Sequence, residues 1–209
     1  MWTLAELASF GSLAKFVCLN NLEWMTELVL RGELASPEHL LIDGVLRYTS
    51  GRCANLFSVL MPQWQANSLR AMQEIVLAAA GNHEGGREVM QLLLQQRGDE
   101  IRITSKVVIA AARNYRDGRQ VMQLLLEARG DEVHITPEVV IAAVRGGSTK
   151  TMQLLLEEKG DEVHITPEVV IAAAGNHGGG RDVMQLLLKA RGDEIRITPE
   201  VVIAAAGNY

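Results

Sequence analysis

Two short apolar strings with helical spacing repeat along this chain. The first, Met-Gln-Leu-Leu-Leu, begins at Met90, Met122, Met152 and Met184, at intervals of 32, 30 and 32 residues. The second, Val-Val-Ile-Ala-Ala, begins at Val107, Val139, Val169 and Val201, at the same intervals. A period of this size predicts units of one supersecondary element each, which bury their apolar faces only by stacking on their neighbours.

The connections between the strings differ in how constant they are. From the first string to the second the distance is always 17 residues, whereas from the second to the next first it is 15, 13 and 15. A packed connection does not tolerate insertions, while a surface turn changes length at little cost. The constant connection is therefore predicted to be packed, and the variable one to be an exposed turn.

Each unit predicts two short helices. In one unit, a helix runs from Val121 to Arg129 and ends at Gly130, which the pattern predicts to adopt the left-handed conformation. The next helix has Thr136 as its N-cap and Pro137 at its first position, and it continues to Val144.

The segment between these two helices alternates polar and apolar residues from Asp131 to Ile135. In an extended conformation Val133 and Ile135 point inward, and Glu132 and His134 point outward. The segment predicts a short finger rather than a full strand. The fold class is then an all-α solenoid of stacked helix-turn-helix repeats with short extended fingers.

The repeats are most regular in the C-terminal two thirds of the chain. Residues 69–209 are predicted to hold near-identical repeats of 30–32 residues, in one continuous solenoid with what precedes them. Residues 1–68 are predicted to form a divergent N-terminal capping helix and worn repeats. Both cysteines and most aromatic residues fall in that first part, as suits a cap with its own outer face.

The order of Thr-Pro, Ala-Ala, Gly, Val-Met-Gln-Leu-Leu-Leu and Arg-Gly-Asp resembles the ankyrin repeat. The resemblance is good over roughly residues 70–209, although Val140 stands where that family has a histidine and the finger is shorter. The Gly-Asp-Glu-Val/Ile-x-Ile-Thr and Ala-Ala-Gly-Asn signatures are similar to the ankyrin-like tracts of fungal NACHT/NLR-type proteins. That resemblance implies the C-terminal sensor segment of a larger NTPase receptor.

Composition narrows the class of function. Hydrophobic residues make up 48% and charged residues 22%, as in folded globular proteins. A net charge of −5 argues against broad binding to nucleic acid or acidic membranes, and no apolar run is long enough to cross a bilayer. Two cysteines are too few for a disulfide framework, and the N-terminus does not read as a signal peptide, so we expect a cytoplasmic protein.

The sequence offers no catalytic constellation and predicts no enzyme, cofactor or metal site. It lacks Gly-x-Ser-x-Gly, His-Glu-x-x-His and Cys-x-x-Cys, and the segment 145–151 has the wrong glycine spacing for a phosphate-binding loop. Cys18 and Cys53 are interpreted as structural thiols. His134 and His164 lie one repeat apart, too far to share a metal ion. The Arg-Gly-Asp tripeptides are interpreted as helix C-termini.

The amino-acid sequences of the copies differ mainly at the finger and in the turn. Variation at such exposed positions can determine which partner a repeat protein binds. The residues predicted to contact a protein partner are Arg102, Tyr115, Glu132, His134, Glu162, His164 and Arg196. The function expected first is a non-catalytic protein-interaction scaffold. The alternatives are the sensor segment of a larger NACHT-type receptor, and an enzyme with a pocket in the N-terminal cap. The uncapped apolar face at Val201–Ile203 also predicts self-association.

Overall fold

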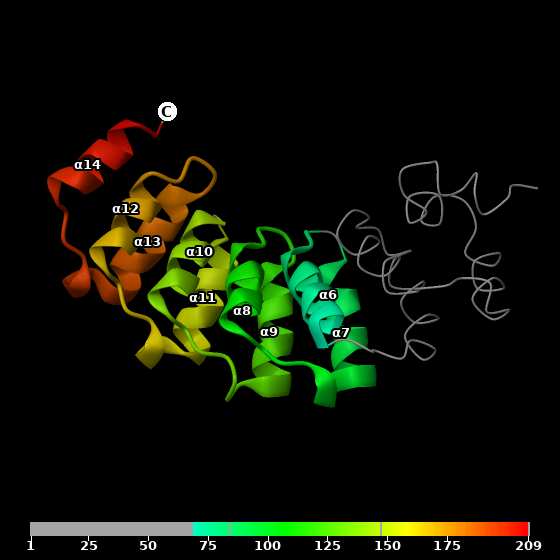
Figure 1. Ribbon diagram of the computed structural model, residues 1–209. Coiled ribbons are helices and arrows are strands. Elements are labelled where there is room, and N and C mark those ends of the chain that lie inside the picture. The colour runs from blue at the N-terminus through cyan, green and yellow to red at the C-terminus, as the bar shows by residue number, and fades with distance from the viewer. Residues whose placement is uncertain (1–68, 84, 147, 209) are drawn as a thin grey trace, which may run out of the picture. The chain divides into compact units, whose positions relative to one another are not determined.

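The computed structural model describes residues 69–83, 85–146 and 148–208 (Figure 1). The chain divides into two compact units, residues 1–102 and 103–209, and each is described by itself. The capping helix and worn repeats predicted for residues 1–68 lie outside the described residues. So do Cys18, Cys53 and the pocket that an enzyme in the N-terminal cap would need.

The described part of the first unit is a helical hairpin. Helix α6 (Leu69–Gly81) packs against α7 (Gly86–Arg97), and a 3₁₀ turn, η1 (Gly98–Glu100), follows. Ile75 and Val76 of α6 are fully buried, as are Met90 and Leu93 of α7. The turn between the helices needs Gly85, which has a φ of 111°, a conformation that residues with a Cβ rarely adopt.

The second unit repeats this hairpin three times and then adds one helix. Its elements are α8 (Ser105–Arg113), α9 (Gly118–Arg129), α10 (Pro137–Arg145), α11 (Thr149–Glu158), η2 (Gly160–Glu162), α12 (Pro167–Ala174), α13 (Gly180–Arg191), η3 (Gly192–Glu194) and α14 (Pro199–Ala206). Helices α8, α10, α12 and α14 pack side by side in one row, and α9, α11 and α13 form a second row beneath it (Figure 1). The prediction of an all-helical fold is confirmed for the described residues.

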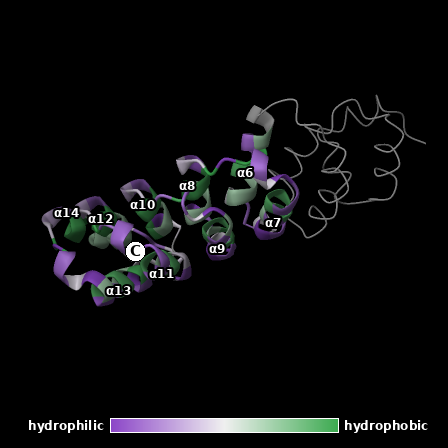
Figure 2. Ribbon diagram, turned by 90° about the horizontal axis from the view of Figure 1, so that it is seen from below, coloured by the Kyte–Doolittle hydropathy of each residue, from purple (hydrophilic) through white to green (hydrophobic). Residues whose placement is uncertain are grey.

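The two apolar strings form the core between the rows. Val107, Val139 and Val169 are at most 1% exposed in the first row, and Met122 and Leu125 are fully buried in the second. Helices α9, α11 and α13 are hydrophobic along one side and hydrophilic along another (Figure 2), whereas α12 and α14 have no polar residue after the glutamate of their first turn. Because each hairpin covers only part of its apolar side alone, the neighbouring hairpins complete its burial.

The predicted helix starts are correct, although the capping group differs. Thr136 is extended and directly precedes Pro137, the first residue of α10, but its side chain accepts no capping hydrogen bond. Instead, the Thr136 hydroxyl and the backbone N–H of Glu138 stabilise the Glu138 carboxylate and lower its pKa. A carboxylate in the first turn also interacts favourably with the positive end of the helix.

The sequence predicts a left-handed conformation for Gly130, which follows α9, the second helix of its hairpin. This prediction is wrong. Gly130 has φ −55° and ψ −31°, and Gly192 has φ −60°, both right-handed. The chain continues to wind in the same sense through Gly-Asp-Glu, and the N–H of Val133 closes this turn on the carbonyl of Gly130 at 3.3 Å. A tight right-handed turn therefore ends the helix without the reversal that a left-handed residue provides.

The fingers agree with their predicted alternation. Val133 is fully buried and Ile135 is 5% exposed, while His134 between them is exposed. Val163 and Ile165 are buried in the same way around exposed His164. No strand is assigned anywhere in the described ranges, which is consistent with a finger too short to pair into a sheet.

Candidate functional site

The variable finger residues lie at exposed positions. His134, His164 and Arg196 occupy equivalent places in the second unit, and all three side chains are exposed. Arg102 is exposed in the first unit. In the second unit, the exposed tips of three successive fingers thus present two histidines and an arginine, side chains whose N–H groups can donate hydrogen bonds to a partner.

The finger glutamates, which the sequence assigns to the same surface, link consecutive repeats. Glu132 accepts a hydrogen bond from Arg129 at 2.6 Å through Oε1, and one from the backbone N–H of Ile103 at 3.2 Å through Oε2. Glu162 repeats the arrangement with Lys159 at 3.0 Å and the N–H of Ile135 at 2.9 Å. Each carboxylate therefore joins the helix end of its own repeat to the finger of the preceding repeat.

The charge environment of Glu162 reflects these contacts. The backbone N–H of Ile135, and then Lys159, hold the pKa of Glu162 below its ordinary value, with a smaller contribution from the nearby His134. Hydrogen bonds to the charged form favour ionisation even at a partly exposed carboxyl. Glu162 is therefore ionised at neutral pH and engaged within the fold.

The same short-range pair recurs at the other described helix ends. Arg97 pairs with Glu100 at 2.5 Å, and Arg191 pairs with Glu194 at 2.8 Å. Arg191 also donates to the carbonyl of Gly160 at 2.8 Å, which links its repeat to the preceding one. The arginines of the Arg-Gly-Asp tripeptides are thus the last residues of their helices, as interpreted from the sequence.

A second set of links lies at the opposite end of the helices. The Asn176 side chain donates to the carbonyls of Val144 at 2.5 Å and Arg145 at 3.3 Å, in the preceding repeat. Asn208 donates in turn to Ala174 and Asn176, both at 3.0 Å. In the sequence, Ala-Ala-Gly-Asn stands only as a signature of the family resemblance, and this role of its asparagine is missed. The recurrence of the asparagine seven residues after Ile75, Val107, Val169 and Val201 is the signal that could have found it.

The repeat that lacks this asparagine has Gly146 in its place. A Cβ at Gly146 would lie 2.8 Å from the carbonyl oxygen of Arg113, so a side chain does not fit there. The turn after it is two residues shorter than in the other repeats, and Ser148 caps α11 by accepting a hydrogen bond from the N–H of Thr151 at 3.2 Å. The segment that superficially suggests a phosphate-binding loop is thus a turn between two helices.

Tyr115 lies apart from the fingers. It is 56% exposed in the turn between α8 and α9, with the guanidinium carbon of Arg116 5.8 Å from its ring centre. The finger follows the other end of α9, and twelve helical residues separate the two ends by about 18 Å. The structure therefore does not bring Tyr115 together with the finger residues on one small surface.

The described ranges show neither a metal cluster nor a membrane span. No group of three His, Cys, Asp or Glu side chains among them could hold a metal ion. None of the described helices has the length and apolar character that a bilayer-spanning segment needs.

One family model matches this chain. It is described as "Domain of unknown function (DUF7104)", and it matches residues 73–90, 92–122, 124–148, 154–184 and 186–209, which together make up more than half of the sequence. The 31-residue matches run from the second helix of one repeat into the second helix of the next, so the unit of the family is one repeat. No curated protein and no solved structure matches the chain.

Proposed function

The chain belongs to the family described as Domain of unknown function (DUF7104), a name that assigns no activity, and we propose that it is a non-catalytic scaffold that binds a protein partner. In this proposal the hairpins form an ankyrin-like solenoid, and the partner lies along the exposed finger tips. Affinity comes from a preformed array that loses little conformational freedom on binding.

The observation that carries the proposal is that neighbouring positions of a finger differ in burial and in how much they vary between copies. In two successive fingers, Glu132 and Glu162 bind the finger of the preceding repeat, and the two aliphatic residues beside each glutamate are buried. The position that varies, occupied by His134, His164 and Arg196, is exposed between them. A rigid backbone with variable exposed tips is the arrangement by which repeat proteins encode a partner.

The finger tips favour a partner rich in hydrogen-bond acceptors. Arg196 carries five N–H donors and pairs well with carboxylates, and an imidazole can donate through one or both ring nitrogens. The neighbouring carboxylates of Glu132 and Glu162 accept hydrogen bonds within the fold. The groups that the finger tips offer to a partner are therefore mainly hydrogen-bond donors. Acidic side chains and backbone carbonyls on the partner suit this surface.

The test compares proteins retained from source cells by three immobilised forms of the 209-residue chain. The finger variant carries His134→Ala, His164→Ala and Arg196→Ala, and the matched control carries Gln123→Ala, Gln153→Ala and Gln185→Ala on the exposed side of the second helices. A partner bound by the fingers is retained by the wild type and by the control, and is depleted about tenfold or more on the finger variant. A set of retained proteins that is the same for all three forms would refute the proposal.

A further inference from the structure

A groove of about 460 Å³ lies in the second unit where the first-row helices end. This end of the helices carries the turns, and the opposite end carries the fingers (Figure 1). The apolar part of the groove is lined by Ile171, Ala172 and Ala204. Its polar part is lined by Arg145, the last residue of α10, and by His177 in the turn after α12. The groove thus places an aliphatic surface beside two side chains with N–H donors.

Glycine at the end of α12 leaves room for this groove. Arg113 and Arg145 are the last residues of α8 and α10, whereas Gly175 stands at the same position after α12. A Cβ at Gly175 would lie 3.7 Å from the Cβ of Ala204, so any side chain here would begin inside the groove. Its absence leaves the space between α10 and α14 open.

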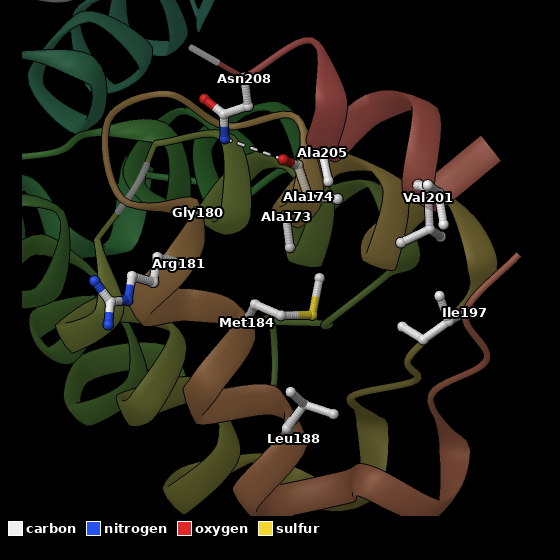
Figure 3. A pocket seen from close by; sticks show the side chains of 11 residues that line it. Ala173, Ala174, Gly180, Arg181, Met184, Leu188, Ile197, Val201, Ala205 and Asn208 are labelled. Carbon is white, nitrogen blue, oxygen red and sulfur yellow. Dashed lines mark hydrogen bonds between the residues drawn. The ribbon is translucent and has the colours of Figure 1, made fainter. Parts of the chain in front are cut away.

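The face of the row that carries the groove is not covered by later repeats. Ile109 and Ile141, the equivalents of Ile171 in α8 and α10, are half-buried, although further hairpins follow both. Each following hairpin adds one helix beside the last helix of the row and one beneath it (Figure 1). The wall formed by α14 is fixed against α12 by Asn208, which donates to the carbonyl of Ala174 at 3.0 Å (Figure 3).

The backbone acceptors around the groove are already paired, whereas its two donor side chains are not. Asn176 donates to the carbonyls of Val144 and Arg145 and accepts from the N–H of Gly178. The guanidinium of Arg145 and the imidazole of His177 form no hydrogen bond or ion pair with another described residue. No acidic residue lines the groove. An anion that enters it therefore meets two donors and no competing carboxylate.

The turns around the groove are positive, although the whole chain has a net charge of −5. Residues 113–119, 145–151 and 175–182 contain six Arg and Lys residues and two Asp residues. The cations are Arg113, Arg116, Arg119, Arg145, Lys150 and Arg181. A local excess of positive charge on an acidic protein directs acidic partners to that surface.

We propose that this groove binds an acidic peptide segment of a partner protein. A carboxylate of the segment pairs with Arg145 and His177, and a neighbouring aliphatic side chain covers Ile171 and Ala204. The volume lies within the range of about 300–1,000 Å³ that is typical of ligand pockets. The apolar part favours a peptide over a nucleic acid, because a phosphate backbone has no aliphatic group to place there. The groove lies at the opposite end of the helices from the finger tips, so this proposal does not rest on the finger surface.

A phage-displayed library of random heptapeptides supplies the probe. The library is first depleted on the Arg145→Gln chain and then selected on the wild-type 209-residue chain, so that peptides bound elsewhere are discarded. Enriched sequences are expected to combine Asp or Glu with Leu, Ile or Val one or two positions away. The most enriched sequence is synthesised and titrated calorimetrically, and one peptide per chain is expected to bind. Replacing its acidic residue by the corresponding amide should weaken binding about tenfold or more.

Two matched pairs of chain variants locate the peptide. Arg145→Gln weakens binding about tenfold or more, whereas Arg113→Gln, the same change one hairpin earlier and outside the lining, leaves it within about twofold of wild type. Ala204→Glu places a carboxylate in the lining and abolishes binding, whereas Ala206→Glu, at an exposed position outside the lining, leaves it within about threefold. Circular dichroism melting checks that all four variants keep the fold, and the finger variant described above binds the peptide normally.

Three outcomes would overturn the proposal. The first is a selection that yields no peptide, or only peptides without an acidic residue. The second is binding that the two members of either pair of variants weaken equally. The third is displacement of the peptide by an equal concentration of a single-stranded DNA oligonucleotide, because the surface would then recognise polyanions in general.

Discussion

The carboxylate of Glu162 accepts a hydrogen bond of 2.9 Å from the backbone N–H of Ile135, 27 residues earlier in the chain. The finger that contains Ile135 is extended, yet no neighbouring strand is present among the described residues to pair with its backbone. A partly buried N–H without a partner is costly. The glutamate of the next repeat thus accepts the backbone hydrogen bond that an adjacent strand would accept in a sheet.

Removing this carboxylate should weaken the contact between two repeats. Glu162→Ala leaves the Ile135 N–H and Lys159 without this acceptor, and we expect a loss of about 1 kcal/mol in the free energy of unfolding, since the pair is partly exposed to solvent. Urea denaturation measures it. The control is Asp161→Ala, an exposed residue of the same turn, and equal losses for the two variants would contradict the role given to Glu162.

The stabilisation from Glu162 should depend on pH. Its pKa is lowered from 4.5 by the Ile135 N–H and by Lys159, so the folded state favours the charged form. The contribution is therefore complete above pH 4.5 and is lost as the pH falls through the lower pKa of the folded state. We expect the difference in unfolding free energy between wild type and Glu162→Gln to shrink as acid is added below pH 4.5. A difference that stays constant over that range would show that ionisation of Glu162 does not contribute.

The helices and the finger alternation could be predicted because they depend on local patterns. Period and apolar spacing locate the paired helices, and strict alternation is enough to direct Val133 inward and His134 outward. These features depend only on residues that are close together in the sequence, and not on contacts between repeats. Several near-identical copies of one pattern make the inference stronger than a single segment allows.

The links between repeats could not be predicted from residue type. Glu132 and Glu162 bind backbone groups 29 and 27 residues away, and a backbone N–H is the same in every residue. Asn176 likewise binds carbonyls of the preceding repeat. The sequence predicts the wrong conformation for Gly130 because glycine permits a right-handed turn as readily as a left-handed one. Only the identity of these residues between copies signals that they have a structural role.

The asparagine link should be as important as the glutamate link. Asn176→Ala removes the donor to Val144 and Arg145, and we expect a loss of about 1–2 kcal/mol in unfolding free energy. Asn176→Asp keeps an acceptor for the N–H of Gly178 but places oxygen against carbonyl oxygen, so it should be at least as destabilising. Thermal and urea unfolding provide the measurement, with exposed His177→Ala as the control. An aspartate variant as stable as the wild type would show that the donated bonds contribute nothing.

Two glycines of the second unit should respond in opposite directions to the same substitution. A Cβ at Gly118 would lie 2.6 Å from the carbonyl oxygen of Ala111, so Gly118→Ala must separate α8 from α9 and should cost about 1–3 kcal/mol. Gly192 has nothing within 4 Å of an added Cβ and a right-handed φ of −60°, so Gly192→Ala should stabilise by about 0.4–1 kcal/mol by restricting the unfolded chain. Urea unfolding of both variants measures the two changes in the free energy of unfolding. If Gly118→Ala is neutral, the close approach of α8 and α9 does not require glycine.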